Sequence, residues 1–204
     1  LEPPRRGLRT GGSVNSATMT DSTQKTASYT VPGMSTEDGA RVAEILQDRL
    51  NALNDLHLTL KHVHWNVVGP NFISVHEMLD PQVEAVRGFA DDVAERIATL
   101  GGSAKGTPGT IVAQRSWDDY SIGRAPAIEH LGALDLVYTG VISDYREAIE
   151  KTGDIDPVTE DLLIGHSGQL ELFHWFVRAH LENAGGQLST AGASSEKEAA
   201  ADAG

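Results

Sequence analysis

The chain has 204 residues, of which 40% are hydrophobic and none is cysteine, and its formal net charge is −13. This length suits one domain with a sizeable core, and the absence of cysteine excludes disulfides and thiolate metal sites. The negative charge opposes non-specific attraction to DNA or anionic lipid. No apolar run approaches the roughly twenty residues of a membrane span, and no stretch resembles a secretion signal, so we expect a cytoplasmic protein without membrane partners.

The first 34 residues are predicted to form a flexible N-terminal tail. Residues 1–34 are rich in Gly, Ser, Thr and Pro and lack apolar periodicity. Met19 opens the run MTDSTQK, so residues 1–18 can be upstream sequence. Four basic residues stand against two acidic ones in the tail, a net charge of +2, from Arg5, Arg6, Arg9 and Lys25 against Glu2 and Asp21.

Two long helices are predicted in the first half of the chain. The first should cover residues 35–66, where Ser35 and Asp38 resemble a capping pair and apolar residues follow at helical spacing. The second should cover residues 71–100. Pro81 lies inside this second segment and should either kink the helix or mark its start, because proline lacks a backbone donor.

A long connection separates these helices from two more. Residues 101–116 are rich in Gly, Ser and Thr, and the segment Trp117–Tyr120 can add a short extra helix. A third long helix should cover residues 127–151, and a fourth should begin after an Asp156 N-cap with Pro157 at its first position. Four long helices with one long middle crossover predict an all-α, ferritin-like four-helix bundle.

The division of the chain follows from this reading. The bundle should span residues 35–186, because Gly185 and Gly186 stop the fourth helix. Residues 187–204 are rich in Ala, Ser, Gly and acids, with a net charge of −2, and are predicted to form a flexible acidic C-terminal tail.

One face of the second predicted helix carries a histidine and three carboxylates. At about 100° of rotation per residue, Asp80, Asp91 and Glu95 fall within roughly 100° of His76. Imidazole and carboxylate without thiolate form the ligand set of iron, manganese or zinc. A solvated acidic face with an incidental histidine would show the same spacing, so the spacing alone leaves both interpretations open.

The two ends of this face are too far apart for one ion. Asp91 lies roughly 22 Å along the helix from His76, whereas metal–ligand bonds are only about 2 Å long. An antiparallel crossing of two copies about a two-fold axis would solve this. It would bring His76 and Asp80 of one chain to Asp91 and Glu95 of the other, and would make two identical sites per dimer.

Two further histidines, His64 and His174, are weighed as metal ligands by their surroundings. His64 borders the apolar stripe of the first helix. Gly69 and Pro70 break the helical pattern between His64 and His76, and a turn there can bring the two histidines together. The fourth helix holds one Glu-x-x-His motif, Glu171 to His174. An intrachain di-iron centre needs two such motifs, so we interpret this pair as a surface acid and a packed histidine.

The run HVHWNVVGPNFISVHEMLD over residues 62–80, followed by Asp91 and Glu95 in DDVAER, resembles the Dps family, the DNA-binding proteins from starved cells, and its actinobacterial members most. The resemblance covers residues 31–186. It implies a hollow homododecamer that oxidises Fe²⁺ with hydrogen peroxide and stores ferric mineral. It also implies a ferroxidase centre shared between two subunits, with catalytic metal ligands His64, His76 and Asp80 from one chain and Asp91 and Glu95 from the other.

The resemblance extends to an aromatic residue and to a pore. Trp65 resembles the family's radical-quenching aromatic, although a core aromatic would fit the same position. Iron must enter through a polar pore, and Asp161 is the best candidate for lining it. Three further acids near the start of the fourth helix are weaker pore candidates, and acids favouring the helix dipole are the other interpretation: Asp154, Asp156 and Glu160.

The tails depart from the pattern of DNA-binding relatives, which commonly use a tail rich in Lys or Arg. The C-terminal tail here is acidic, and the N-terminal tail is basic only if residues 1–18 belong to the protein. We therefore expect a cytoplasmic iron-oxidising cage with weak, tail-dependent DNA binding. One rival is a nucleoid-associated DNA-protecting protein with secondary iron oxidation, and another is a shell without catalysis, against which the ligand set argues.

Overall fold

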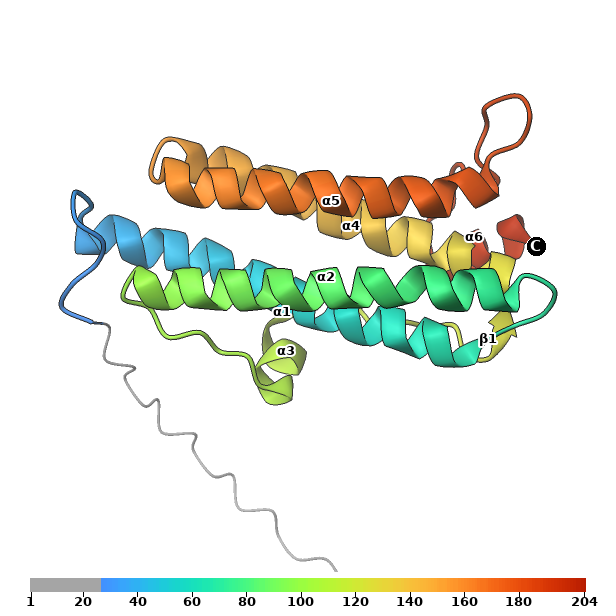
Figure 1. Cartoon of the computed structure of the whole chain (residues 1–204), viewed down its shortest axis with the longest axis horizontal. Coiled ribbons are helices and arrows are strands. Elements are labelled where there is room, and N and C mark those ends of the chain that lie inside the picture. The colour runs from blue at the N-terminus through green and yellow to red at the C-terminus, as the bar shows by residue number, and fades with distance from the viewer. Residues whose placement is uncertain (1–26) are drawn as a thin grey trace, which may run out of the picture.

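A computed structural model describes residues 27–204; residues 1–26, most of the predicted N-terminal tail, lie outside the described part. Four long helices lie along the length of the molecule (Figure 1): α1 (Thr36–Asn66), α2 (Phe72–Thr99), α4 (Ala127–Gly153) and α5 (Pro157–Leu181). The smaller elements are α3 (Pro108–Gln114), α6 (Glu196–Ala203) and the parallel pair β1 (Val67–Val68) and β2 (Ala125–Pro126). The predicted all-α, ferritin-like four-helix bundle with a long crossover is confirmed.

The starts of the helices follow local chemistry. The backbone N–H of Asp38 donates to Ser35 Oγ at 3.0 Å, and the Ser35 hydroxyl donates to the Asp38 carboxylate at 2.7 Å. Helix α5 begins at Pro157, as predicted. Helix α2 runs without a break through Pro81, so a helix start at this proline is wrong. Pro81 is exposed, and so is Glu77, whose carbonyl loses its helical partner, so water can satisfy that carbonyl.

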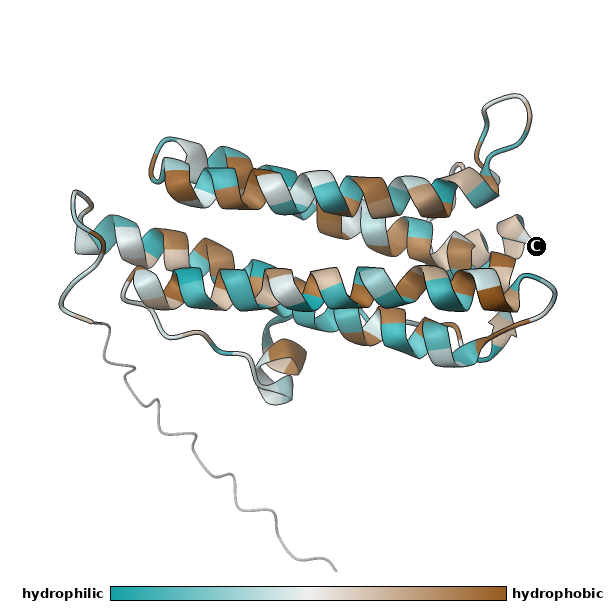
Figure 2. Cartoon of the chain, in the orientation of Figure 1, coloured by the Kyte–Doolittle hydropathy of each residue, from teal (hydrophilic) through white to brown (hydrophobic). Residues whose placement is uncertain are grey.

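The core lies between two tightly packed helix pairs, α1 with α2 and α4 with α5. Brown and teal segments alternate along every long helix in Figure 2, the pattern of one apolar face per helix. The largest fully buried side chains come from α1, α2, α4 and α5 and include Leu53, Leu60, Leu79, Tyr138, Tyr145 and Leu170. Within residues 27–204, no helix is both long enough and apolar enough to cross a membrane.

The crossover between α2 and α4 differs from the prediction in one detail. Its short helix is α3, which starts at Pro108, a favoured first helical residue, and not at Trp117–Tyr120. Trp117 is instead held in a non-helical segment, because its indole N–H donates to Asp55 Oδ2 at 2.8 Å. The pairing of Val67 with Ala125 then closes the crossover against the end of α1.

The C-terminal residues 187–204 are folded, so their prediction as a flexible tail is wrong. Helix α6 packs on α4 with Ala199 and Ala200 buried. Gly132 of α4 permits this approach, since a Cβ there would collide with the carbonyl oxygen of Ala199. Glu196 accepts hydrogen bonds from the backbone N–H and the hydroxyl of Ser121, at 2.7 and 2.8 Å. Ala199, Ala200 and Ala203 thus give this acidic segment an apolar face.

The described end of the predicted N-terminal tail also belongs to the fold. The backbone N–H of Ala27 donates to the carbonyl of Gly101 at 3.1 Å. Val31 and Met34 pack against the hydrophobic core. The folded unit therefore begins before residue 35, and the rest of that prediction concerns residues 1–26, outside the described part.

Candidate metal centre

His64 ends up beside His76 because the chain reverses between α1 and α2. Gly69 has a φ of +96° in this turn, a conformation that glycine adopts at little cost. The two imidazole rings stack with their centroids 3.6 Å apart and their planes 23° from parallel. The prediction that a turn between the two helices brings these two histidines together is therefore confirmed.

Two backbone carbonyls determine which ring nitrogens carry hydrogen. His64 Nδ1 lies 3.0 Å from the carbonyl oxygen of His76, and His76 Nδ1 lies 2.9 Å from the carbonyl oxygen of His64. A carbonyl can only accept, so both Nδ1 atoms must donate. Each neutral ring then keeps its lone pair on Nε2, the form in which an imidazole binds a metal ion.

Asp80 completes this cluster from one turn further along α2. Its Oδ1 lies 3.3 Å from His64 Nδ1 and accepts a hydrogen bond from Lys61 Nζ at 3.1 Å. That hydrogen bond is the main reason that the pKa of Asp80 is held below its ordinary value. The side chain is 54% exposed, so an ionised carboxylate is open to an incoming cation.

Asp91 and Glu95 lie on the same helix but not beside this cluster. Both are exposed, and within residues 27–204 neither side chain takes part in an ion pair. Within the same residues, no group of three or more histidines and acids is arranged to hold a metal ion by itself. One chain thus carries a histidine half-site (His64, His76 and Asp80) and a separate acidic half-site (Asp91 and Glu95), as the spacing predicts.

Apolar side chains surround the histidine half-site without being covered by the chain. Trp65 is 71% exposed, so the alternative that it is a core aromatic is wrong for the single chain. Lys61 Nζ lies 5.9 Å from the centroid of its ring. Phe72 and Ile73, 38% and 56% exposed, open α2, and the Phe72 ring lies 5.0 Å from the His76 ring between centroids. Exposed large apolar side chains near the histidines suit contact with another subunit.

Of the acids predicted near a pore, Asp156 is corrected by the structure. Its side chain is buried, pairs with Arg96 Nη2 at 2.6 Å and accepts from the Thr159 hydroxyl. It therefore ties α2 to the start of α5 and cannot present a carboxylate to a channel. Asp154 and Asp161 are exposed and Glu160 is partly exposed, so these three remain candidates.

The Glu-x-x-His motif of α5 consists of a packed histidine and an acid at the surface, as predicted. His174 is buried with its Nε2 2.6 Å from Asp135, and Glu171 pairs with Arg146 at 2.6 Å. Asp135 also accepts from Arg178 at 2.7 Å and from Thr190 at 2.7 Å. Sequence reasoning missed this acid, although an aspartate within the apolar run of α4 was a usable signal.

Comparisons with known proteins find relatives that match most of the chain. The ferritin-like domain family matches residues 43–185. The chain is 66% identical over 173 residues to the DNA protection during starvation protein of Mycolicibacterium smegmatis, covering 85% of this chain and 94% of that protein. The solved structure of Mycobacterium smegmatis Dps matches with a TM-score of 0.81 and 65% identity, covering 82% of this chain and 96% of that one. DpsA14 from Streptomyces coelicolor matches with a TM-score of 0.79 and 69% identity, covering 80% and 97%.

Proposed function

Because the chain belongs to the Dps family of ferritin-like proteins, we propose that it oxidises Fe²⁺ and stores the ferric product inside a cage. One observation carries this proposal. The backbone holds two imidazoles with both Nε2 lone pairs free, next to an exposed and ionised carboxylate. Such a group is unsatisfied within its own chain and needs a cation and further ligands.

The further ligands come from a second copy of the chain. An antiparallel two-fold contact brings the acidic half-site of one chain to the histidine half-site of the other, and makes two sites per dimer. The exposed Trp65, Phe72 and Ile73 supply apolar surface at this contact. We further propose that six such dimers form the homododecamer that the family resemblance implies, enclosing the stored mineral.

The chemistry follows from the ligand types, with iron as the substrate. Neutral imidazoles and hard carboxylates bind Fe²⁺ without holding it permanently, and carboxylates also stabilise Fe³⁺, which favours oxidation at the site. With hydrogen peroxide as oxidant, two Fe²⁺ give up one electron each and the O–O bond breaks to two hydroxides. No hydroxyl radical is released. Trp65, next to His64, is placed to reduce a stray one-electron oxidant.

The test is to add Fe²⁺ to the protein without oxygen, then peroxide, and to follow the absorbance of ferric iron. We expect oxidation well above the rate in buffer, and loss of the acceleration in His76→Ala/Asp80→Ala. His180→Ala is the matched control, because this exposed histidine lies on α5, a helix that carries no residue of either half-site. Light scattering should give about twelve times 21.8 kDa for all three proteins. Oxidation at the buffer rate by the assembled wild type would refute the proposal.

A second candidate function, DNA protection, is favoured by the name of the Mycolicibacterium smegmatis relative. The C-terminal segment is folded on α4 and carries acids, so it does not offer a basic arm. Basic residues in the N-terminal residues 1–18 are the remaining source of phosphate contacts. We therefore propose that each full-length chain binds DNA weakly through its N-terminal residues, and that the many chains of a cage together raise the avidity.

Gel shifts with forms starting at Leu1 and at Met19 test this second function. Binding by the longer form should weaken strongly between about 50 and 200 mM salt, because phosphate contacts release counterions. The form starting at Met19 should bind weakly or not at all, because Lys25 is balanced by Asp21. Tight binding by that shorter form at the higher salt would place DNA protection level with iron oxidation.

A further inference from the structure

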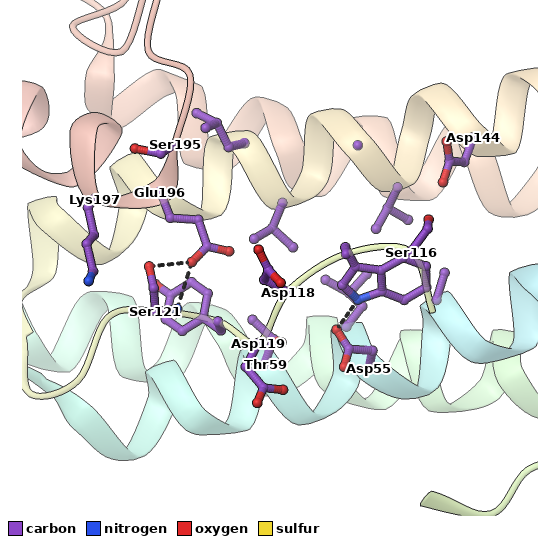
Figure 3. A pocket seen from close by; sticks show the side chains of 18 of the residues that line it. Asp55, Thr59, Ser116, Asp118, Asp119, Ser121, Asp144, Ser195, Glu196 and Lys197 are labelled. Carbon is purple, nitrogen blue, oxygen red and sulfur yellow. Dashed lines mark hydrogen bonds between the residues drawn. The ribbon is translucent and has the colours of Figure 1, made fainter. Parts of the chain in front are cut away.

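A cavity of about 560 Å³ lies between α1 and α4, and none of the candidate iron ligands lines it. The crossover segment 116–121 and residues 194–197, which lead into α6, complete its lining (Figure 3). Its volume is within the range of about 300–1,000 Å³ that is usual for small-molecule sites.

The cavity has an apolar floor and a fixed aromatic wall. Leu56, Val137 and Val141 contribute aliphatic surface from α1 and α4. The indole of Trp117 lines the cavity, and its N–H donates to Asp55 Oδ2 at 2.8 Å. Arg115 holds the other Asp55 oxygen at 3.2 Å. The wall is therefore preformed and presents an aromatic ring to whatever enters.

Carboxylates with spare acceptor capacity surround this apolar interior. Asp118 points into the cavity in Figure 3, and among residues 27–204 its side chain makes no ion pair or hydrogen bond. Glu196 uses one oxygen for Ser121 and leaves the other free. The nearest cation to Asp144 is Arg49 Nη1, at 3.6 Å. Lys197 is the one basic residue in the lining, so the cavity favours cations and repels anions.

These features select among cations. A bare metal ion would need several converging ligands, and within residues 27–204 no such group exists. The aliphatic floor has no ligand for it either. A protonated amine with a methylene chain fits better, since its ammonium groups can donate to carboxylates or lie over the indole while its stem covers the floor. We propose that this cavity binds an aliphatic polyamine, independently of iron oxidation.

Calorimetric titration of the assembled full-length protein with putrescine and spermidine tests this proposal. We expect one saturable site per chain at about 50 mM salt, where screening is modest. Gly140→Leu should abolish binding, because Gly140 lines the cavity and a Cβ there meets nothing within 4 Å, so the added side chain would fill it. Asp118→Asn should weaken binding by about two- to fivefold, the loss of one exposed charged contact.

Controls separate a specific site from the general attraction of a chain with charge −13. Glu150→Gln removes an exposed carboxylate of α4 outside the cavity and should leave the affinity unchanged. Butane-1,4-diol, the uncharged analogue of putrescine, should not bind, and Mg²⁺ should not displace putrescine stoichiometrically. Equal weakening by Glu150→Gln and Asp118→Asn, full displacement by Mg²⁺, or no saturable binding tighter than about 1 mM would each overturn the proposal.

Discussion

Two groups of histidine and aspartate in this molecule have similar composition and opposite organisation. In the interior, both oxygens of Asp135 accept hydrogen bonds, from His174, Arg178 and Thr190. At the histidine half-site, His64 and His76 use only their Nδ1 atoms, and the Asp80 side chain is 54% exposed. The interior group is complete within one chain, whereas the histidine half-site is not.

The difference shows that residue type does not identify a metal site. The Glu-x-x-His motif in α5 has the spacing of a ligand pair, yet Nε2 of its buried histidine lies 2.6 Å from Asp135 Oδ1 in an internal hydrogen-bond network. His64 and His76 have no such motif, yet backbone carbonyls leave their Nε2 atoms free. A site that must bind a cation needs unsatisfied lone pairs that water and ions can reach, and a structural network needs the opposite.

The largest effect should come from breaking the interior group. Asp135→Ala removes the acceptor for one buried histidine, one buried threonine and Arg178. We expect a loss of about 3 kcal/mol in the free energy of unfolding, at the lower end for a broken buried pair because the Arg178 side chain is 42% exposed and can turn to water. Scanning calorimetry of the assembled protein measures this, and iron bound to the histidine half-site should restore little of it.

Acid provides a second measurement on the same group. Burial opposes ionisation of Asp135, but the hydrogen bonds from His174, Thr190 and Arg178 outweigh it and hold the pKa of the carboxyl well below its ordinary value. A lowered folded-state pKa stabilises the fold above the unfolded-state pKa of about 3.9, and that contribution fades as pH falls below this value. In Asp135→Asn the melting temperature should depend less on pH below about 4. An unchanged acid profile would mean that Asp135 is not the group that titrates.

A smaller loss of stability should follow from separating α6 from α4, the helix that carries Asp135. Gly132→Ala places a Cβ against the carbonyl of Ala199, and overpacking of this kind costs about 1–3 kcal/mol. Helix α6 should then open more often, so that trypsin can bind the unfolded backbone around the exposed Lys197. Gly140→Ala is the matched control on the same helix, where a Cβ meets nothing. Mass spectrometry of the digest should show faster cleavage after Lys197 only in Gly132→Ala; equal rates would contradict the close packing.

The sequence predicts the parts of the structure that depend on local chemistry. The cap at Ser35, the helix start at Pro157 and the turn that brings His64 to His76 can be read from neighbouring residues. The non-helical course of residues 117–120 and the folding of residues 187–204 cannot. They depend on contacts between distant residues, Trp117 with Asp55 and Gly132 with Ala199, which leave no periodic signal in the sequence.

The candidate site divides in the same way. Residue spacing separates the histidine half-site from the acidic half-site, because the rise of a helix alone keeps their ligands apart. Spacing does not show that Asp156 turns inward to Arg96, nor that Lys61 holds Asp80. Those contacts join different helices, and only the packing of the bundle reveals them.

The most direct test of the shared site mixes two inactive proteins. His76→Ala/Asp80→Ala lacks the histidine half-site, and Asp91→Ala/Glu95→Ala lacks the acidic one. Random assembly makes half of the dimers mixed, and each mixed dimer carries one intact site of two, so about a quarter of the wild-type sites should return. We predict recovered peroxide-dependent iron oxidation near that level in assemblies whose mixing is verified by mass spectrometry. Verified mixed assemblies that remain as inactive as either parent would contradict a site built from two chains.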